Sequence, residues 1–175
     1  MIIYNTFSGK IVEGKFNGRE CYEMTSRNGI GGLYFATEES KGVLTISKEG
    51  QIVVLTNKAH SSDIIRKIIE NPRELASHEE IADDIIKTIS EYPEVLETLP
   101  IIIAESIPNF AKRLKTQFNL TQIEKTESMS LDEAEKYLEQ TSGHAAKIIA
   151  FIEKFEKIQK MRQGSQIDVD NQQEL

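Results

Sequence analysis

Several residue types are scarce in this chain, and each scarcity excludes a class of structure. Cys21 is the only cysteine among 175 residues, so no disulfide can form within the chain. The longest apolar run, residues 99–104, is far shorter than the roughly 18 residues that a membrane span requires. The first ten residues lack a basic segment followed by an apolar stretch, so we expect no signal peptide. Together these features predict a cytoplasmic protein without a membrane span.

The sequence also lacks residues at the spacings that are typical of metal sites and of activated nucleophiles. The three histidines, His60, His78 and His144, have no second histidine or cysteine at the spacing of a metal site. Cys21 would need a histidine base brought from elsewhere in the chain. We therefore predict no metal, no cofactor and no catalytic residue. This favours a non-enzymatic protein but leaves enzyme activity open.

Acidic residues outnumber basic ones, and the excess is confined to one part of the chain. Residues 1–57 hold six basic and six acidic residues, whereas the remaining 118 hold fifteen basic and twenty-two acidic ones. The net charge of −7 therefore belongs wholly to the second part. Because that part would repel a polyanion, the charge pattern disfavours nucleic acid as a partner.

Glycine and proline are segregated along the chain. Eight of the ten glycines lie in the first 50 residues, and all four prolines lie between residues 72 and 108. The first third alternates short apolar runs with turn signals such as Asn17-Gly18, which strongly indicates a hairpin. Residues 1–57 therefore predict an antiparallel meander that begins at Ile2-Ile3-Tyr4 and is covered on one face by the helices behind it.

An imperfect repeat marks the start of the helical part. Residues 64–75 read IIRKIIENPREL and residues 85–96 read IIKTISEYPEVL, with six of twelve positions identical. Each unit predicts an amphipathic helix that a proline ends, followed by a second short helix. Because two units are too few for a solenoid, we expect paired helix–proline–helix corners within a compact bundle.

The later residues also show helical periodicity. Residues 94–107 predict an apolar helix with a kink or break at Pro100, and Pro108 suits the first turn of the next helix. The last helix, about 144–162, is expected to bury an apolar stripe. Two capping boxes are predicted to start helices: Ser77 with Glu80, and Ser130 with Glu133.

These elements predict an α+β fold. An N-terminal antiparallel β-meander of four to five short strands would pack on a C-terminal bundle of five to six helices. The predicted organisation is a sheet over residues 1–57, a helical bundle over residues 61–163 that shares its core with the sheet, and a disordered tail over residues 164–175.

An acidic cluster is the candidate partner-binding site. Its carboxylates lie on the predicted helix of the second repeat unit and are expected to face outward: Glu79, Glu80, Asp83 and Asp84. A solvated helix face is the common structural interpretation of such a cluster. The functional interpretation is a patch that attracts a basic protein partner.

A glycine-rich loop is the alternative site. Gly29, Gly31 and Gly32 precede Tyr34, and such a loop could let a nucleotide phosphate approach the backbone, although neither common phosphate-loop motif is present. A hairpin loop is the structural interpretation of the same residues. Residues 32–40, GLYFATEES, resemble the strand-then-helix element of mono-ADP-ribosyltransferases. The resemblance implies an NAD-binding enzyme in which Tyr34 stacks on nicotinamide. It spans nine residues, and the family's preceding His or Arg motif and its catalytic Glu motif have no clear counterpart.

Binding without catalysis is the function that the sequence favours. The charge asymmetry and the helical repeat predict a regulatory or accessory protein of the immunity- or inhibitor-like, chaperone-like or phage-type adaptor kind, acting through its acidic helical surface. The nucleotide-binding enzyme is the alternative. A third hypothesis is a homodimer in which the last helix pairs with its copy through four apolar residues: Ile148, Ile152, Phe155 and Ile158.

Overall fold

The computed structural model describes the backbone of most of the chain. The described residues are 14–16, 19–25, 30–35, 41–48, 51–56, 58, 60–97 and 99–173. Side chains are described for residues 55, 56, 58, 60, 61, 63–97 and 99–164. The strand predicted at residues 2–4 and the turn predicted at residues 17–18 lie outside the described residues.

Backbone pairing defines six short strands. They are β1 (Gly14–Phe16), β2 (Arg19–Thr25), β3 (Ile30–Phe35), β4 (Lys41–Lys48), β5 (Gln51–Val54) and β6 (His60–Ser61). Strands β1 to β5 pair antiparallel in chain order, and β6 pairs with β4. The register sets Gly31 opposite Thr45 and Tyr34 opposite Gly42. The pairing of β6 with β4 places His60 directly before the first helix.

The repeat forms two helix–proline–helix corners, as predicted. The first consists of α1 (Ser62–Glu70) and η1 (Pro72–Ser77), and the second of α2 (Glu79–Glu91) and η2 (Pro93–Glu97), where η denotes a 3-10 helix. Asn71 and Tyr92 precede the two prolines and adopt φ of −141° and −132°. A proline disfavours the helical conformation in the residue before it, so both helices end there.

Four further helices follow in the described part of the chain. They are α3 (Ile101–Ser106), α4 (Phe110–Thr126), α5 (Leu131–Gln140) and α6 (Ser142–Gln173). The predicted break at Pro100 is confirmed, because η2 ends before it and α3 begins directly after it. Asn109 precedes α4 with φ of 57°, a left-handed conformation that Asn tolerates better than most residues. The start predicted at Pro108 is therefore two residues too early.

The helix cap predicted at Ser130 forms, and the one predicted at Ser77 does not. The Ser130 side chain accepts a hydrogen bond from the Glu133 N–H at 3.2 Å and so caps α5. The box at Ser77 is wrong, because Ser77 is the last residue of η1 and His78 is the residue that precedes α2. No local pattern predicted that the short helix after Pro72 would extend as far as Ser77.

Among the residues with described side chains, the buried core comes almost entirely from helices. Repeat positions contribute Ile65, Ile68 and Leu75 from the first unit, and Ile86, Ile89 and Leu96 from the second. Phe110 at the start of α4 meets Phe151 and Phe155 of α6 edge-on, with ring centroids 6.0 and 5.5 Å apart. Fully burying a side chain of this size contributes about 1.5–3 kcal/mol. These contacts join both repeat units, α4 and α6 in one core.

The α+β fold class predicted from the sequence is wrong. Among the residues with described side chains, 83% are helical and the only strand is β6. Within these residues Leu55 is the single apolar core member that precedes the helices. Helix α2 packs against α4 and both 3-10 helices, whereas α1 packs against η1 and also against β3 and β4. The described core is therefore a helical bundle.

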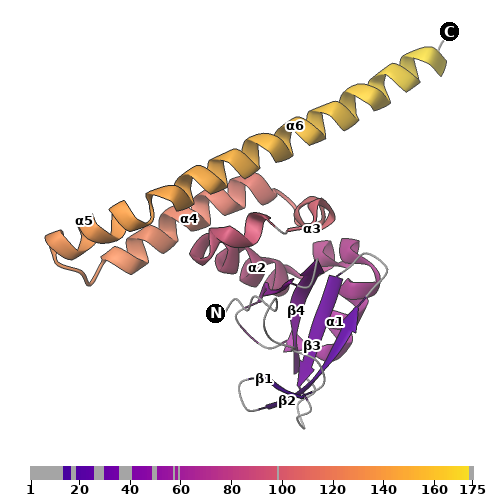
Figure 1. Cartoon of the computed structure of the whole chain (residues 1–175). Coiled ribbons are helices and arrows are strands. Elements are labelled where there is room, and N and C mark those ends of the chain that lie inside the picture. The colour runs from indigo at the N-terminus through magenta and orange to yellow at the C-terminus, as the bar shows by residue number, and fades with distance from the viewer. Residues whose placement is uncertain are drawn as a thin grey trace.

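The last three helices form an elongated arm (Figure 1). We call α4, α5 and α6 the arm, residues 120–140 its tip and residues 154–162 its stem. Helix α6 is 32 residues long, which corresponds to about 48 Å at 1.5 Å per residue. Its backbone stays helical to Gln173, through most of residues 164–175, where a disordered tail was predicted. The arm reaches well beyond the core at the α5 end.

Candidate functional site

The four carboxylates of the predicted acidic cluster do not form one outward-facing patch. Glu79, Glu80 and Asp83 are exposed on α2, whereas Asp84 is buried with 8% of its surface exposed. Helix α2 buries residues on more than one side because it is enclosed by α4 and both 3-10 helices. Asp84 faces the segment before α1 and is buried there, so the prediction that it faces outward is wrong.

Asp84 forms a buried polar pair with His60. The His60 Nε2 atom lies 2.7 Å from Asp84 Oδ2, and both side chains are less than a tenth exposed. The Lys58 backbone N–H donates to the same carboxylate oxygen at 3.1 Å. A buried carboxylate needs such partners, because an unpaired one would lose its hydration without compensation. The pair connects the segment before α1 to the middle of α2.

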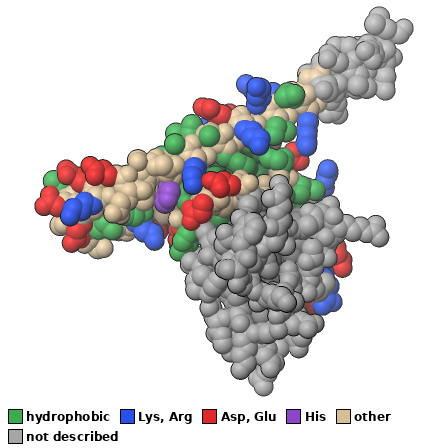
Figure 2. Space-filling view, viewed as in Figure 1, with side chains coloured by type: hydrophobic (Ala, Val, Ile, Leu, Met, Phe, Trp, Pro, Cys, Tyr) green, Lys and Arg blue, Asp and Glu red, His purple; other side chains and the backbone are tan. Residues whose placement is uncertain are grey.

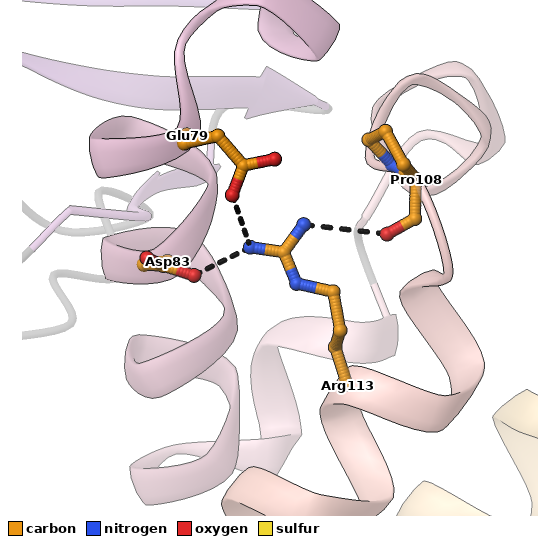
Figure 3. A network of polar contacts seen from close by, with 4 residues as sticks. All are labelled: Glu79, Asp83, Pro108 and Arg113. Carbon is orange, nitrogen blue, oxygen red and sulfur yellow. Dashed lines mark hydrogen bonds and ion pairs between the residues drawn. The ribbon is translucent and has the colours of Figure 1, made fainter.

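Arg113 of α4 holds the exposed carboxylates of the cluster. Its guanidinium lies 2.5 Å from Asp83 Oδ1 and 3.7 Å from Glu79 Oε2, and it donates to the Pro108 carbonyl at 3.3 Å (Figure 3). Asp83 and Glu79 are about 70% exposed, so solvent screens both ion pairs and each contributes little to stability. Two of the four carboxylates thus already have a cationic partner within the chain.

A shallow pocket adjoins Asp84. Its volume is about 460 Å³, and it is lined by Lys58, Glu80, Asp83, Asp84, Lys87 and Gln117. None of these lining residues carries a hydroxyl or thiol that could act as a nucleophile beside the His60–Asp84 pair. Among the described residues, no group of three or more His, Cys, Asp or Glu side chains could hold a metal ion. The geometry supports a structural role for the pair.

No family model, curated protein or solved structure matches this chain. Function must therefore be inferred from the chain's own residues. None of the helices in the described part of the chain has the length and apolarity that spanning a membrane would take.

The alternative site at the glycine-rich loop gains no geometry from the structure. Gly29 lies outside the described residues. Gly31, Gly32 and Tyr34 belong to β3, where the structure describes the backbone and not the side chains. The stacking role that the resemblance implies for Tyr34 stays a prediction.

The arm exposes large apolar side chains that the sequence analysis did not select. Leu120 and Ile123 of α4 are 48% and 61% exposed, and Leu131 and Leu138 of α5 are 82% and 50% exposed. Ile149 of α6, near the tip, is 54% exposed. Between residues 122 and 147 no side chain is buried. The helical spacing of the apolar residues of α5 is visible in the sequence, but their exposure is not.

A polar seam fixes the arm to α2. Ser90 Oγ lies 2.7 Å from Thr121 Oγ1 of α4, and Gln117 Nε2 donates to the same Thr121 oxygen at 3.3 Å. Thr121 is the last buried residue of α4. The seam therefore marks the place where α4 leaves the core and the uncovered tip begins.

Charge changes sign along the arm. The tip holds six acidic and two basic residues, whereas the stem holds four basic residues and one acidic residue. Figure 2 shows red side chains gathered at the α5 end and blue side chains gathered along α6 toward the other end. The Arg162 guanidinium at the end of the stem pairs with Glu105 of α3. The lysines of the stem, Lys154, Lys157 and Lys160, have no ion pair with a described residue.

The apolar residues of α6 that the sequence predicts to pair two copies are mostly buried within one chain. Ile148, Ile152 and Phe155 of α6 are at most 2% exposed because they pack into the core. Ile158 is partly buried. A homodimer through these particular side chains would require α6 to leave its own core.

Proposed function

We propose that this chain is a non-catalytic, protein-binding accessory protein whose docking surface is the acidic and apolar tip of its arm. The observation that carries the proposal is the run from residue 122 to residue 147, which buries no side chain while it exposes Ile123, Leu131 and Leu138. Large apolar side chains gathered on an exposed part of a domain are characteristic of a binding site.

Helix α5 supports the proposal on energetic grounds. It has ten residues, none of them buried. Isolated helices shorter than about 12–15 residues are marginal in water, because few hydrogen bonds offset the cost of nucleation. The Ser130 cap contributes about 1 kcal/mol, which is little for a whole helix. A partner that covers the apolar stripe would supply the missing stabilisation.

We therefore assign the acidic helical surface expected from the sequence to the tip and not to α2. On α2, Asp84 is buried and Arg113 already holds Glu79 and Asp83. At the tip, exposed carboxylates such as Glu135 and Glu139 flank the apolar stripe and would steer a basic partner toward it. An inhibitor-like, chaperone-like or adaptor role would use such a surface, and the single cysteine suits the predicted cytoplasmic location.

Comparison of two variants with the wild type tests this proposal. The tip variant combines Ile123→Ser, Leu131→Ser and Leu138→Ser, and the control variant carries Glu80→Lys on α2. Each tagged full-length protein is recovered from its native cells, and bound proteins, including untagged copies of the chain, are quantified by mass spectrometry. We expect the tip variant to lose its partners and the control to keep them.

If the tip variant kept its partners and the control lost them, the binding site would lie on α2. Unchanged recovery with both variants would overturn a role for either surface. Because all substituted tip residues are exposed, circular dichroism should show both variants folded.

A further inference from the structure

We propose that the tip docks on the stem of a second copy of this chain, in an antiparallel dimer of arms. This inference rests on the proposed function, because it names the protein that covers the tip. It differs from the homodimer predicted from the sequence, since it leaves the apolar core residues of α6 in place and uses surfaces exposed in one chain.

Charge complementarity identifies the second copy as the partner. Six acidic residues against two basic ones give the tip a negative charge, and three lysines against Glu156 leave the stem positive even with Arg162 paired to Glu105. The two surfaces lie toward opposite ends of one elongated arm (Figure 2). An arm with one acidic and one basic end attracts its own copy when the two lie antiparallel and repels it when they lie parallel.

The arrangement is closed and self-complementary. In a twofold dimer each residue contact occurs twice, so each tip would meet the partner's stem in two equivalent contacts. The length of α6, about 48 Å, lets both contacts form at once along one side of the arms. No free tip would remain to recruit a third copy.

Apolar contacts would accompany the charges. The stem exposes Met161, which is 64% exposed, beside the lysines, while the tip offers Leu131 and Leu138. Methionine is an adaptable side chain that fills irregular apolar surfaces, and the aliphatic stems of lysine can cover leucine while their ammonium groups reach carboxylates. The same contact would therefore satisfy both the apolar stripe and the acidic residues of α5.

A charge-swap experiment tests the dimer. The tip-reversed variant carries Glu124→Lys, Glu135→Lys and Glu139→Lys, and the stem-reversed variant carries Lys154→Glu, Lys157→Glu and Lys160→Glu. A matched control reverses three exposed charges on the helical core instead, with Arg66→Glu, Lys67→Glu and Arg73→Glu. All nine residues are exposed, so none of the changes disturbs the core. Molar mass is measured by light scattering after size exclusion at low salt.

The wild type and the control should have twice the chain mass of 19.8 kDa, and each reversed variant alone should have the mass of one chain. An equimolar mixture of the two reversed variants should return to the dimer mass, because both tip–stem contacts then join opposite charges. Rescue in the mixture also shows that both variants are folded.

A wild type of single-chain mass at every concentration would overturn the proposal, as would a dimer that both reversals leave intact, or a mixture that stays monomeric. Failure of the dimer is distinguishable from failure of the proposed function. A monomeric wild type whose tip variant still loses other partners would leave the protein-binding function standing with a different occupant.

Discussion

Asp84 is buried by its neighbours, and this separates it from the exposed acidic residues of the same helix. Its carboxylate is enclosed with His60, while Glu80, one turn earlier on α2, stays exposed. The sequence predicted both as parts of one surface, because helical periodicity identified a single apolar stripe. Burial of Asp84 could not be predicted, since its partner is 24 residues away and lies on a strand, not on a helix.

Removing the buried partner should reveal its contribution to stability. Asp84→Ala leaves the His60 ring nitrogen and the Lys58 N–H without their acceptor, so we expect the free energy of unfolding to fall by about 1–3 kcal/mol. Glu80→Ala, on the exposed side, should change it by less than about 0.5 kcal/mol. Urea denaturation followed by circular dichroism measures both.

The His60–Asp84 contact itself is isolated by a double-mutant cycle. With His60→Ala added, the loss should be smaller than the sum of the two single losses by about 0.5–3 kcal/mol. Strict additivity would show that the two side chains do not interact in solution.

Sequence patterns predict the helical elements better than they predict the contacts between these elements. Pro72 and Pro93 end α1 and α2 as predicted, because the residue before a proline avoids the helical conformation. The short helices after them are 3-10 helices, and the extent of η1 displaced the predicted cap at Ser77. Helical periodicity does not distinguish an apolar stripe packed in a core from one left exposed, as the leucines of α5 are.

Substitutions of leucines in the core and of a leucine at the tip should therefore differ in their effect on stability. Leu75→Ala and Leu96→Ala, at matching repeat positions in the core, should each lower the free energy of unfolding by about 2–5 kcal/mol. Leu131→Ala, which is 82% exposed, should change it by less than about 0.5 kcal/mol. A large loss for Leu131 at concentrations where the protein is monomeric would show that α5 packs within its own chain.

At the scale of the whole molecule, the residues with described side chains form a compact helical core that carries a long arm with an acidic tip and a basic stem. The predicted α+β class is wrong because the residues with described side chains are mostly helical, and among them Leu55 is the only member of the buried apolar cluster that precedes α1. The acidic excess was visible in the composition. Its concentration at the end of an uncovered arm depended on where α4 leaves the core at Thr121, which no local pattern specifies.

Hydrogen exchange of α5 in the full chain, measured over a range of protein concentrations, tests whether a second copy covers the tip. In one chain α5 buries no side chain, so its amides should exchange quickly in dilute solution. We predict that their exchange slows as concentration rises, together with that of residues 154–162, while the core amides of α2 stay unchanged. Rapid exchange of α5 at every concentration would contradict the antiparallel dimer of arms.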